Sequence, residues 1–227
     1  MTGRIVPRAL TITVNDVPAV SGLLQVPQRA RACYVLAHGA GAGMTHSFMA
    51  AVADGLSALS VATLRYQFPY MERGSRRPDV PSLAHATVRA AVATATRLTP
   101  ALPLFAGGKS FGARMTSQAQ VEAALPNVRG LVFLGFPLHS AKKPSVDRAQ
   151  HLFDVRTPML FLQGTRDALA DLRLLVPLID QLGQGATLSL VEDGDHSFHV
   201  RAQSGRTDQQ ALDKALIALV RWMGALL

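Results

Sequence analysis

Short apolar runs alternate with longer segments of helical periodicity along most of the chain. In the first run Leu10, Ile12 and Val14 alternate with threonines, which predicts a strand with one buried face. A second strand over 21–26 is predicted to return antiparallel to it. Six further runs are more continuously apolar, as is typical of strands covered on both faces: 33–37, 61–66, 104–107, 131–135, 159–163 and 188–191.

Helical periodicity fills most of the gaps between these runs. Helices are predicted over 48–59, 85–98, 112–125 and 168–182. Pro177 predicts a kink or a break in the last of these. Thr207 and Gln210 are spaced as a capping box at the start of a final helix. The alternation predicts an α/β fold, an eight-stranded mainly parallel sheet with helices on both faces.

Length and composition narrow the class of protein. The 227 residues predict one domain over 1–227, and 48% apolar against 17% charged residues excludes an intrinsically disordered chain. We expect a cytoplasmic protein, because no apolar stretch reaches the ~18 residues of a membrane span and the first ten residues lack a signal-peptide core. The single cysteine, Cys33, offers neither a disulfide nor a metal cluster.

The formal net charge of +8 raises the question of a nucleic-acid partner. Only four of the 23 basic residues are lysines, and the arginines are scattered, with their densest run at 73–77. Because phosphate binding needs clustered cations, we interpret the charge as a solvated basic surface and expect no nucleic-acid partner. The sequence leaves the oligomeric state open.

The strongest chemical signal lies where a predicted strand ends and a predicted helix begins. There Gly108, Ser110 and Gly112 fit the G-x-S-x-G pattern of a nucleophile elbow. Such a turn holds its serine in a strained conformation that exposes the hydroxyl, and side chains two positions away would collide with the adjoining strand and helix. Ser110 is therefore the candidate nucleophile.

Two nucleotide-binding interpretations fail on spacing. A phosphate-binding P-loop needs a glycine five positions before its Gly-Lys pair, and that position holds Pro103. The glycines of segment 39–43 lack the G-x-G-x-x-G spacing, and the next strand ends in Arg65 and Tyr66 rather than in an acidic residue. We therefore expect no cofactor, and no metal either.

The glycine-rich segment after the third strand suits an oxyanion hole. Gly39 and Gly41 allow a substrate carbonyl to approach the backbone, so both are candidate substrate contacts. The N–H groups of Ala40 (or Gly41) and Phe111 are the candidate oxyanion donors. His38 is expected to hold the loop, because it precedes the serine in the chain.

A serine hydroxyl needs a base that a carboxylate orients, in the chain order Ser, Asp or Glu, His. Asp167 after the seventh strand and His196 after the eighth satisfy this order and share the sheet edge of Ser110. The neighbouring candidates are expected to start a helix, shape a turn or face solvent: Asp171, Asp193, Asp195 and His199. Lys109 either tunes the field at the serine or makes a structural hydrogen bond, and Tyr70 either lines the substrate pocket or braces its loop.

Together these segments resemble the α/β-hydrolase superfamily. The resemblance is carried by HGAGAG (38–43), RYQFPY (65–70), GGKSFGARM (107–115), GFPLH (135–139), QGTRD (163–167) and GDHSF (194–198). Within the superfamily they are similar to the cap-less, dienelactone-hydrolase-like branch that includes testis-expressed and histone-acetyltransferase-complex subunit homologues. The resemblance implies a three-layer fold without a cap, with Ser110 as nucleophile, Asp167 as acid and His196 as base. Dienelactone hydrolases carry a cysteine where this chain has Ser110.

These observations predict a serine hydrolase that cleaves a small carboxylic ester or another activated acyl compound through an acyl-enzyme. The segment 136–154 is too short for a folded cap, so we expect an open site for a small-molecule substrate, with a flexible lid formed by this segment as the alternative. The alternative is a non-catalytic scaffold or partner-binding protein that keeps the fold, since fold alone does not determine function. An intact triad beside a glycine loop favours the enzyme.

Overall fold

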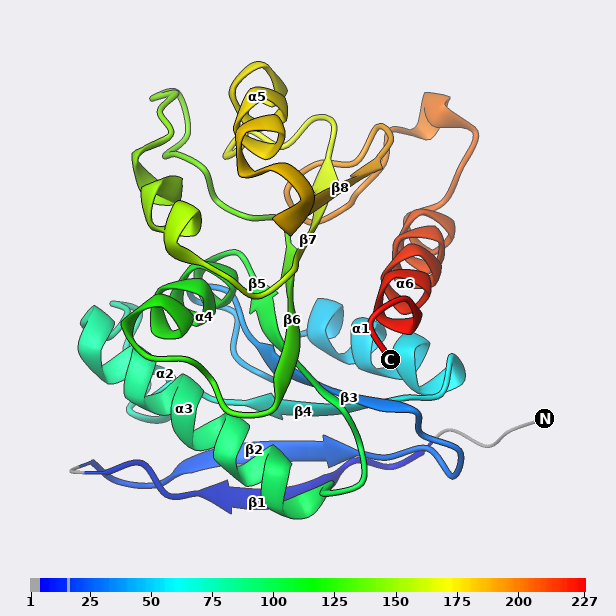
Figure 1. Ribbon diagram of the computed structural model, residues 1–227. Helices are drawn as coiled ribbons and strands as arrows, with labels where there is room; N and C mark the ends of the chain where they lie inside the picture. Colours follow the sequence, from blue (N-terminus) through cyan, green and yellow to red (C-terminus); the bar gives the residue numbers. More distant parts are fainter. Residues whose placement is uncertain (1–4, 16) are drawn as a thin grey trace.

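The computed structural model describes residues 5–15 and 17–227, and in this part of the chain eight strands form one twisted sheet (Figure 1). The strands are β1 (Arg8–Ile12), β2 (Val20–Gln25), β3 (Ala32–Ala37), β4 (Val61–Tyr66), β5 (Leu104–Lys109), β6 (Val128–Leu134), β7 (Met159–Gly164) and β8 (Ala186–Val191). Their order is β1-β2-β4-β3-β5-β6-β7-β8. β2 pairs antiparallel with both β1 and β4, whereas all other pairs are parallel. The predicted α/β class and the mainly parallel sheet are confirmed.

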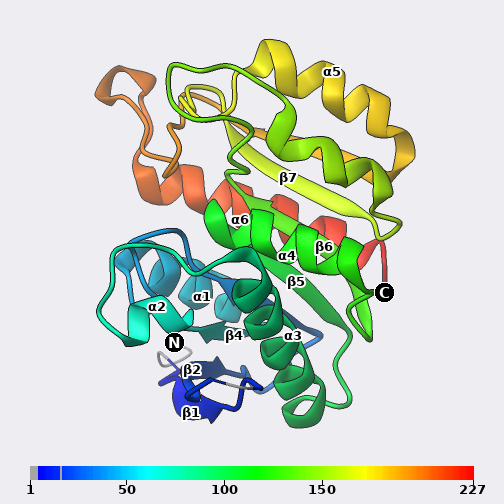
Figure 2. The same cartoon turned by 90° about the vertical axis from the view of Figure 1, so that its left-hand side faces the viewer.

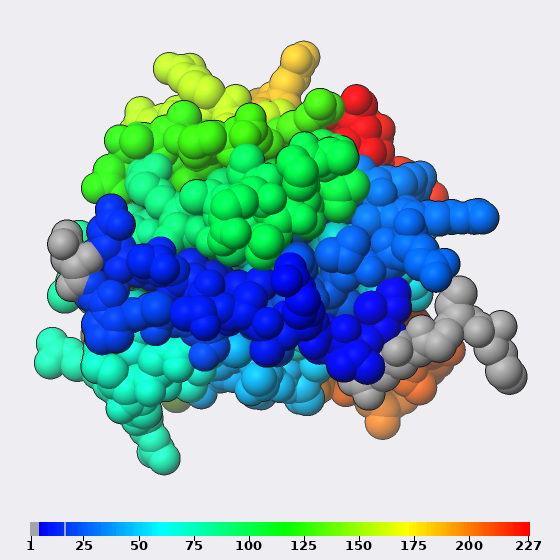
Figure 3. Space-filling view, turned by 90° about the horizontal axis from the view of Figure 1, so that it is seen from below, coloured from blue at the N-terminus to red at the C-terminus, as the bar shows by residue number. Residues whose placement is uncertain are grey.

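Helices cover the sheet on both faces. The α-helices are α1 (Ser47–Ala58), α2 (Pro69–Glu72), α3 (Pro81–Leu98), α4 (Phe111–Glu122), α5 (Leu172–Leu182) and α6 (Asp208–Gly224). The described residues also form three 3₁₀ helices: η1 (Asp147–Asp154), η2 (Gly183–Gly185) and η3 (Ala202–Ser204). One core lies under α1 and α6, and another lies under α3, α4 and α5, the side that faces the viewer in Figure 2. At the sheet edge, β1 lies next to α3 (Figure 3).

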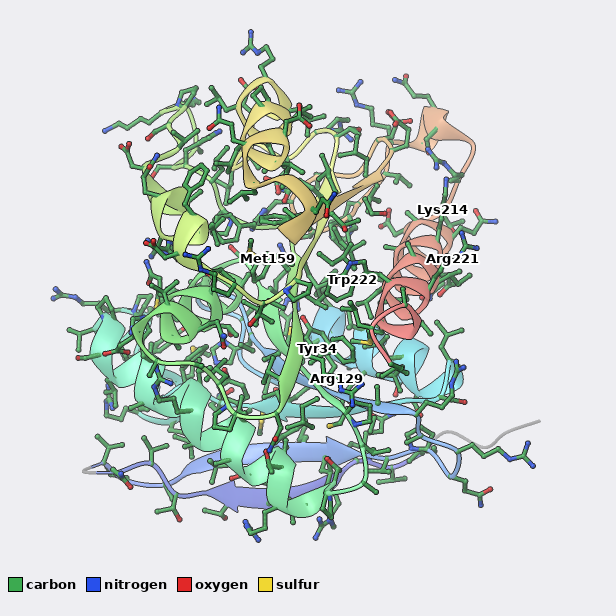
Figure 4. All side chains as sticks on the ribbon, in the orientation of Figure 1. Tyr34, Arg129, Met159, Lys214, Arg221 and Trp222 are labelled. Carbon is green, nitrogen blue, oxygen red and sulfur yellow. The ribbon has the colours of Figure 1, made fainter. Side chains whose placement is uncertain are left out.

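The central strands are buried on both faces, as their continuous apolar runs predicted. All six residues of β3 are buried; Tyr34 and Leu36 belong to the core under α1 and α6, and Val35 to the opposite one. α6 is anchored by Trp222 (Figure 4). The Trp222 ring lies 6.0 Å from that of Phe105 on β5. The sheet is therefore a rigid middle layer from which the loops at its carboxyl edge project.

Two helices begin elsewhere than predicted, and one prediction about proline is wrong in part. α3 begins at Pro81 rather than at residue 85, because proline suits the first helical turn, where no N–H partner is needed. α5 begins at Leu172 rather than at residue 168, after an N-cap formed by Asp171. The helix continues through Pro177, which is exposed, so water can bond the carbonyl that loses its helical donor and no break occurs.

The connection between β6 and β7 bears on access to the carboxyl edge of the sheet. Residues 135–158 contain one 3₁₀ helix, η1, and one short turn at 141–142, and no cap folds over the sheet in the described chain. No helix of the described residues has the length and apolar character needed to cross a membrane.

The predicted capping box of α6 is present. The Thr207 hydroxyl accepts the Gln210 N–H, and the Gln210 side chain accepts the Thr207 N–H. Replacing Thr207 by Ala should lower the free energy of unfolding by about 1 kcal/mol, because an N–H at the helix start loses its partner. Urea denaturation measures the change, with Thr13→Ala at an exposed site as control. Equal stability of the two variants would contradict this account of α6.

Candidate active site

Ser110 occupies the turn between β5 and α4 in a strained conformation. Its backbone angles are φ 51° and ψ −110°, a region that side-chain-bearing residues rarely adopt. Its hydroxyl does not cap α4 and makes no hydrogen bond among the described residues, His196 included. The half-buried side chain is thus held at the carboxyl edge of the sheet without a structural role for its hydroxyl.

The glycines on either side of Ser110 are required by the close approach of β3. A Cβ at Gly108 would lie 2.2 Å from the Ala37 carbonyl oxygen, and one at Gly112 would lie 2.7 Å from the same atom. Gly108 also has a φ of +157°, which side chains disfavour. Glycine is needed at both positions, as predicted. In both cases, however, the side chain would collide with the end of β3.

Asp167 and His196 meet at the carboxyl edge from the loops after β7 and β8. The His196 Nδ1 lies 2.7 Å from Asp167 Oδ2. The Asp167 side chain is fully buried, whereas that of His196 is 25% exposed. A carboxylate only accepts, so Nδ1 carries the imidazole proton and Nε2 is left as an acceptor that faces away from Asp167.

The Asp167 carboxylate has two further partners that fix its orientation. Oδ1 accepts the Leu169 N–H at 2.8 Å, and Oδ2 accepts the Gln163 side-chain amide. The Gln163 Oε1 accepts the Phe136 N–H at 2.9 Å, which ties the loop after β6 to the same carboxylate. Sequence reasoning missed Gln163; the available signal was a polar residue at the end of an otherwise apolar strand.

Lys109, directly before the nucleophile candidate, is buried. Its Nζ donates to the His196 carbonyl oxygen at 2.5 Å and lies 5.8 Å from the ring centroid of Phe48. Burial lowers the pKa of Lys109 to about 8, against the opposing charges of Asp167 and Asp195. Of the two interpretations that the sequence left open, the hydrogen bond is present in the structure.

The loop after β3 is held by His38 and lies beside Ser110. His38 is buried; its Nδ1 donates to the Gly39 carbonyl at 2.7 Å and its Nε2 accepts the Phe68 N–H at 3.0 Å. Burial lowers the pKa of His38, which keeps the ring neutral in this bridging role. A Cβ at Gly39 would stand 3.8 Å from the Ser110 Cβ. The loop-holding role expected of His38 matches these contacts.

Tyr70 joins this loop to the nucleophile turn. Its buried ring packs edge-on against Phe111 with centroids 6.3 Å apart, and its hydroxyl accepts the Gly41 N–H at 3.1 Å. The Gly41 N–H is thereby engaged. The N–H groups of Ala40 and Phe111 donate to no other group in the described part of the chain. Of the two donors weighed for the loop, Ala40 is the one that remains free.

The neighbouring acidic residues and histidine serve turns and caps. Asp171 accepts the Arg173 N–H as the N-cap of α5, and Asp195 accepts the N–H groups of Ser197 and His199. His199 is exposed and pairs with Asp208 at 2.7 Å. Among the described residues, no three His, Cys, Asp or Glu side chains gather into a metal site.

Comparison with known proteins extends this picture. The family model of an alpha/beta hydrolase domain matches residues 30–224. A dienelactone hydrolase from Anabaena variabilis superposes with a TM-score of 0.77 at 21% identity, over 99% of both chains. A serine hydrolase without a lid from Xanthomonas campestris gives a TM-score of 0.70 at 22% identity, over 96% of this chain and 95% of that one.

A third similar structure is Est1E from Butyrivibrio proteoclasticus, with a TM-score of 0.67 at 15% identity over 94% of this chain and 99% of that one. At such identities the likeness concerns the fold, which is the three-layer, cap-less architecture described above. Since the family model spans most of the chain, the protein belongs to the alpha/beta hydrolase family.

Proposed function

We propose that the protein is a serine hydrolase in which Ser110 is the nucleophile, His196 the general base and Asp167 the residue that orients it. The observation that carries the proposal is the 2.7 Å bond between His196 Nδ1 and the buried Asp167 carboxylate, at the sheet edge where Ser110 projects an unused hydroxyl. A scaffold has no need for a strained serine beside an oriented histidine. The absence of a direct bond from Ser110 to His196 agrees with free enzymes, where such bonds are often long and shorten on substrate binding.

The proposed reaction is acyl transfer. His196 Nε2 takes the Ser110 proton while Oγ attacks the carbonyl carbon, whose π electrons move to the oxygen. The N–H groups of Ala40 and Phe111 stabilise that oxyanion, a contribution of ~3–4 kcal/mol per donor where measured in other enzymes. The tetrahedral intermediate then expels the leaving group, which takes the proton from His196, and water cleaves the acyl-enzyme by the same route.

The substrate class we propose is a small carboxylic ester or another activated acyl compound. The connection between β6 and β7 builds no cap, so the carboxyl edge stays open to solvent. Gly39 and Gly41 are the proposed substrate contacts: a Cβ at Gly39 would lie 3.8 Å from that of Ser110, and the space beside Gly41 is open, with no atom within 4 Å of a Cβ placed there. Tyr70 acts on this site by holding Gly41, which sets the position of the Ala40 N–H.

A fluorophosphonate probe tests the nucleophile. We expect one covalent adduct, located on Ser110 by peptide mapping, because phosphonylation requires an activated serine. Ser110→Ala and His196→Ala should each abolish labelling, whereas His199→Ala, on the same loop but paired with Asp208, should label like the wild type. Ester turnover retained in Ser110→Ala, or an adduct that persists in His196→Ala, would overturn the assignment.

The identity of the acid is tested by Asp167→Asn. Since an amide can donate to Nδ1 and favour the wrong tautomer, kcat on p-nitrophenyl acetate should fall by about 10⁴-fold, as for the equivalent change in another serine hydrolase. Asp171→Asn is the matched control, because asparagine also caps a helix and should leave kcat unchanged. If Asp171→Asn were the damaging change, the acid would have been assigned to the wrong residue.

A further inference from the structure

Lys109 differs from the other lysines of the chain. Lys142, Lys143 and Lys214 are exposed, whereas Lys109 has 7% of its surface accessible. Its ammonium reaches across the end of β6 to the carbonyl oxygen of His196, a residue 87 positions further along the chain. Burying an ammonium is costly, and a methionine would fill the same volume without that cost. The charge at this position therefore calls for a functional explanation.

The surroundings of Lys109 are built to admit this contact. Gly135 follows β6 with a φ of +69°, and a Cβ there would lie 2.8 Å from Lys109 Nζ and 3.1 Å from the His196 carbonyl oxygen. On the other side, the ammonium faces the ring of Phe48, which packs edge-on against Phe198 with centroids 5.7 Å apart. The loop that carries His196 is therefore in contact with α1, with the residue that follows β6 and with Lys109 at the nucleophile turn.

We propose that Lys109 is a positioning residue that fixes His196 through its backbone carbonyl, so that the imidazole faces Ser110. This inference rests on the function proposed above. Asp167 holds the Nδ1 edge of the ring and Lys109 holds the main chain of the same residue, which gives His196 two fixed points on different loops. A displacement of a catalytic group by about 1 Å can lower the rate about 10²-fold. Because the Lys109 contact fixes the position of the His196 imidazole, we expect its loss to slow the chemical step and to leave substrate binding unchanged.

Lys109→Met tests the proposal with Lys214→Met, on the exposed face of α6 (Figure 4), as the matched control. In Lys109→Met we expect kcat on p-nitrophenyl acetate to fall ~10- to 100-fold, with KM within about twofold of wild type. Thermal unfolding should be unchanged or shifted upward, because an ammonium no longer needs to be buried. Lys109→Gln serves as a second variant should the methionine variant fail to fold.

The pH profile separates this role from simple packing. The charged or titratable groups that face the ammonium are Asp167 after β7 and Asp195 and His196 after β8, and none is altered by the variants. Because the pKa of Lys109 is about 8, the ammonium is present below that pH and is lost above it. Wild-type kcat should therefore decline above about pH 8. Lys109→Met should lack that decline, and Lys109→Arg, which stays cationic, should recover part of the rate and keep it to higher pH.

Two readouts separate this inference from the proposed function. If wild-type Ser110 is labelled by fluorophosphonate and Lys109→Met is labelled equally fast with the same alkaline decline, the positioning role is wrong while the hydrolase proposal stands. If the wild type is not labelled, the hydrolase proposal fails. The downfield proton resonance of His196 Nδ1–H then tests positioning alone: its broadening in Lys109→Met but not in Lys214→Met supports the role, and an unchanged resonance overturns it.

Discussion

The close backbone approach of β3 to the end of β5 is the constraint on which the site depends. The Ala37 carbonyl comes so near that Gly108 and Gly112 have no room for a side chain. Ser110, held between them, turns into a strained conformation at the carboxyl edge of the sheet. The same approach brings the loop after β3 against the start of α4, where a Cβ at Gly112 would lie 2.7 Å from the His38 carbonyl oxygen. A looser junction would relax the serine and separate this loop from α4.

The remaining parts of the site come from loops that the parallel strands deliver to the same edge. Hydrogen bonds from Gln163 and Leu169 fix the orientation of the Asp167 carboxylate, and this carboxylate in turn orients the His196 ring through its Nδ1. Tyr70 and His38 brace the glycine loop through hydrogen bonds to backbone groups. The protein therefore holds its candidate catalytic groups by a rigid sheet and by backbone contacts between loops, which is the arrangement that preorganised acyl-transfer chemistry requires.

Much of the fold and of the candidate site could be predicted from residue patterns, because hydrophobic periodicity and turn chemistry are local properties of the sequence. Apolar runs located all eight strands, and the G-x-S-x-G spacing with the order of Asp167 and His196 located the candidate triad. The contacts of Gln163 with Phe136 and of Lys109 with His196 could not be predicted, because each joins a strand residue to a loop that follows another strand, and no local pattern specifies how that loop lies. The narrower likeness to testis-expressed and histone-acetyltransferase-complex subunit homologues stays a prediction.

An acyl-enzyme on Ser110 is the intermediate on which the proposed function depends. It can be trapped by rapid mixing with p-nitrophenyl acetate, quenching in acid and mapping of the acetylated peptide. We expect a burst of p-nitrophenolate that approaches one equivalent per chain, with the acetyl group on Ser110. Release of p-nitrophenolate with the acetyl group on another residue, or with no acetylated peptide at any quench time, would contradict it.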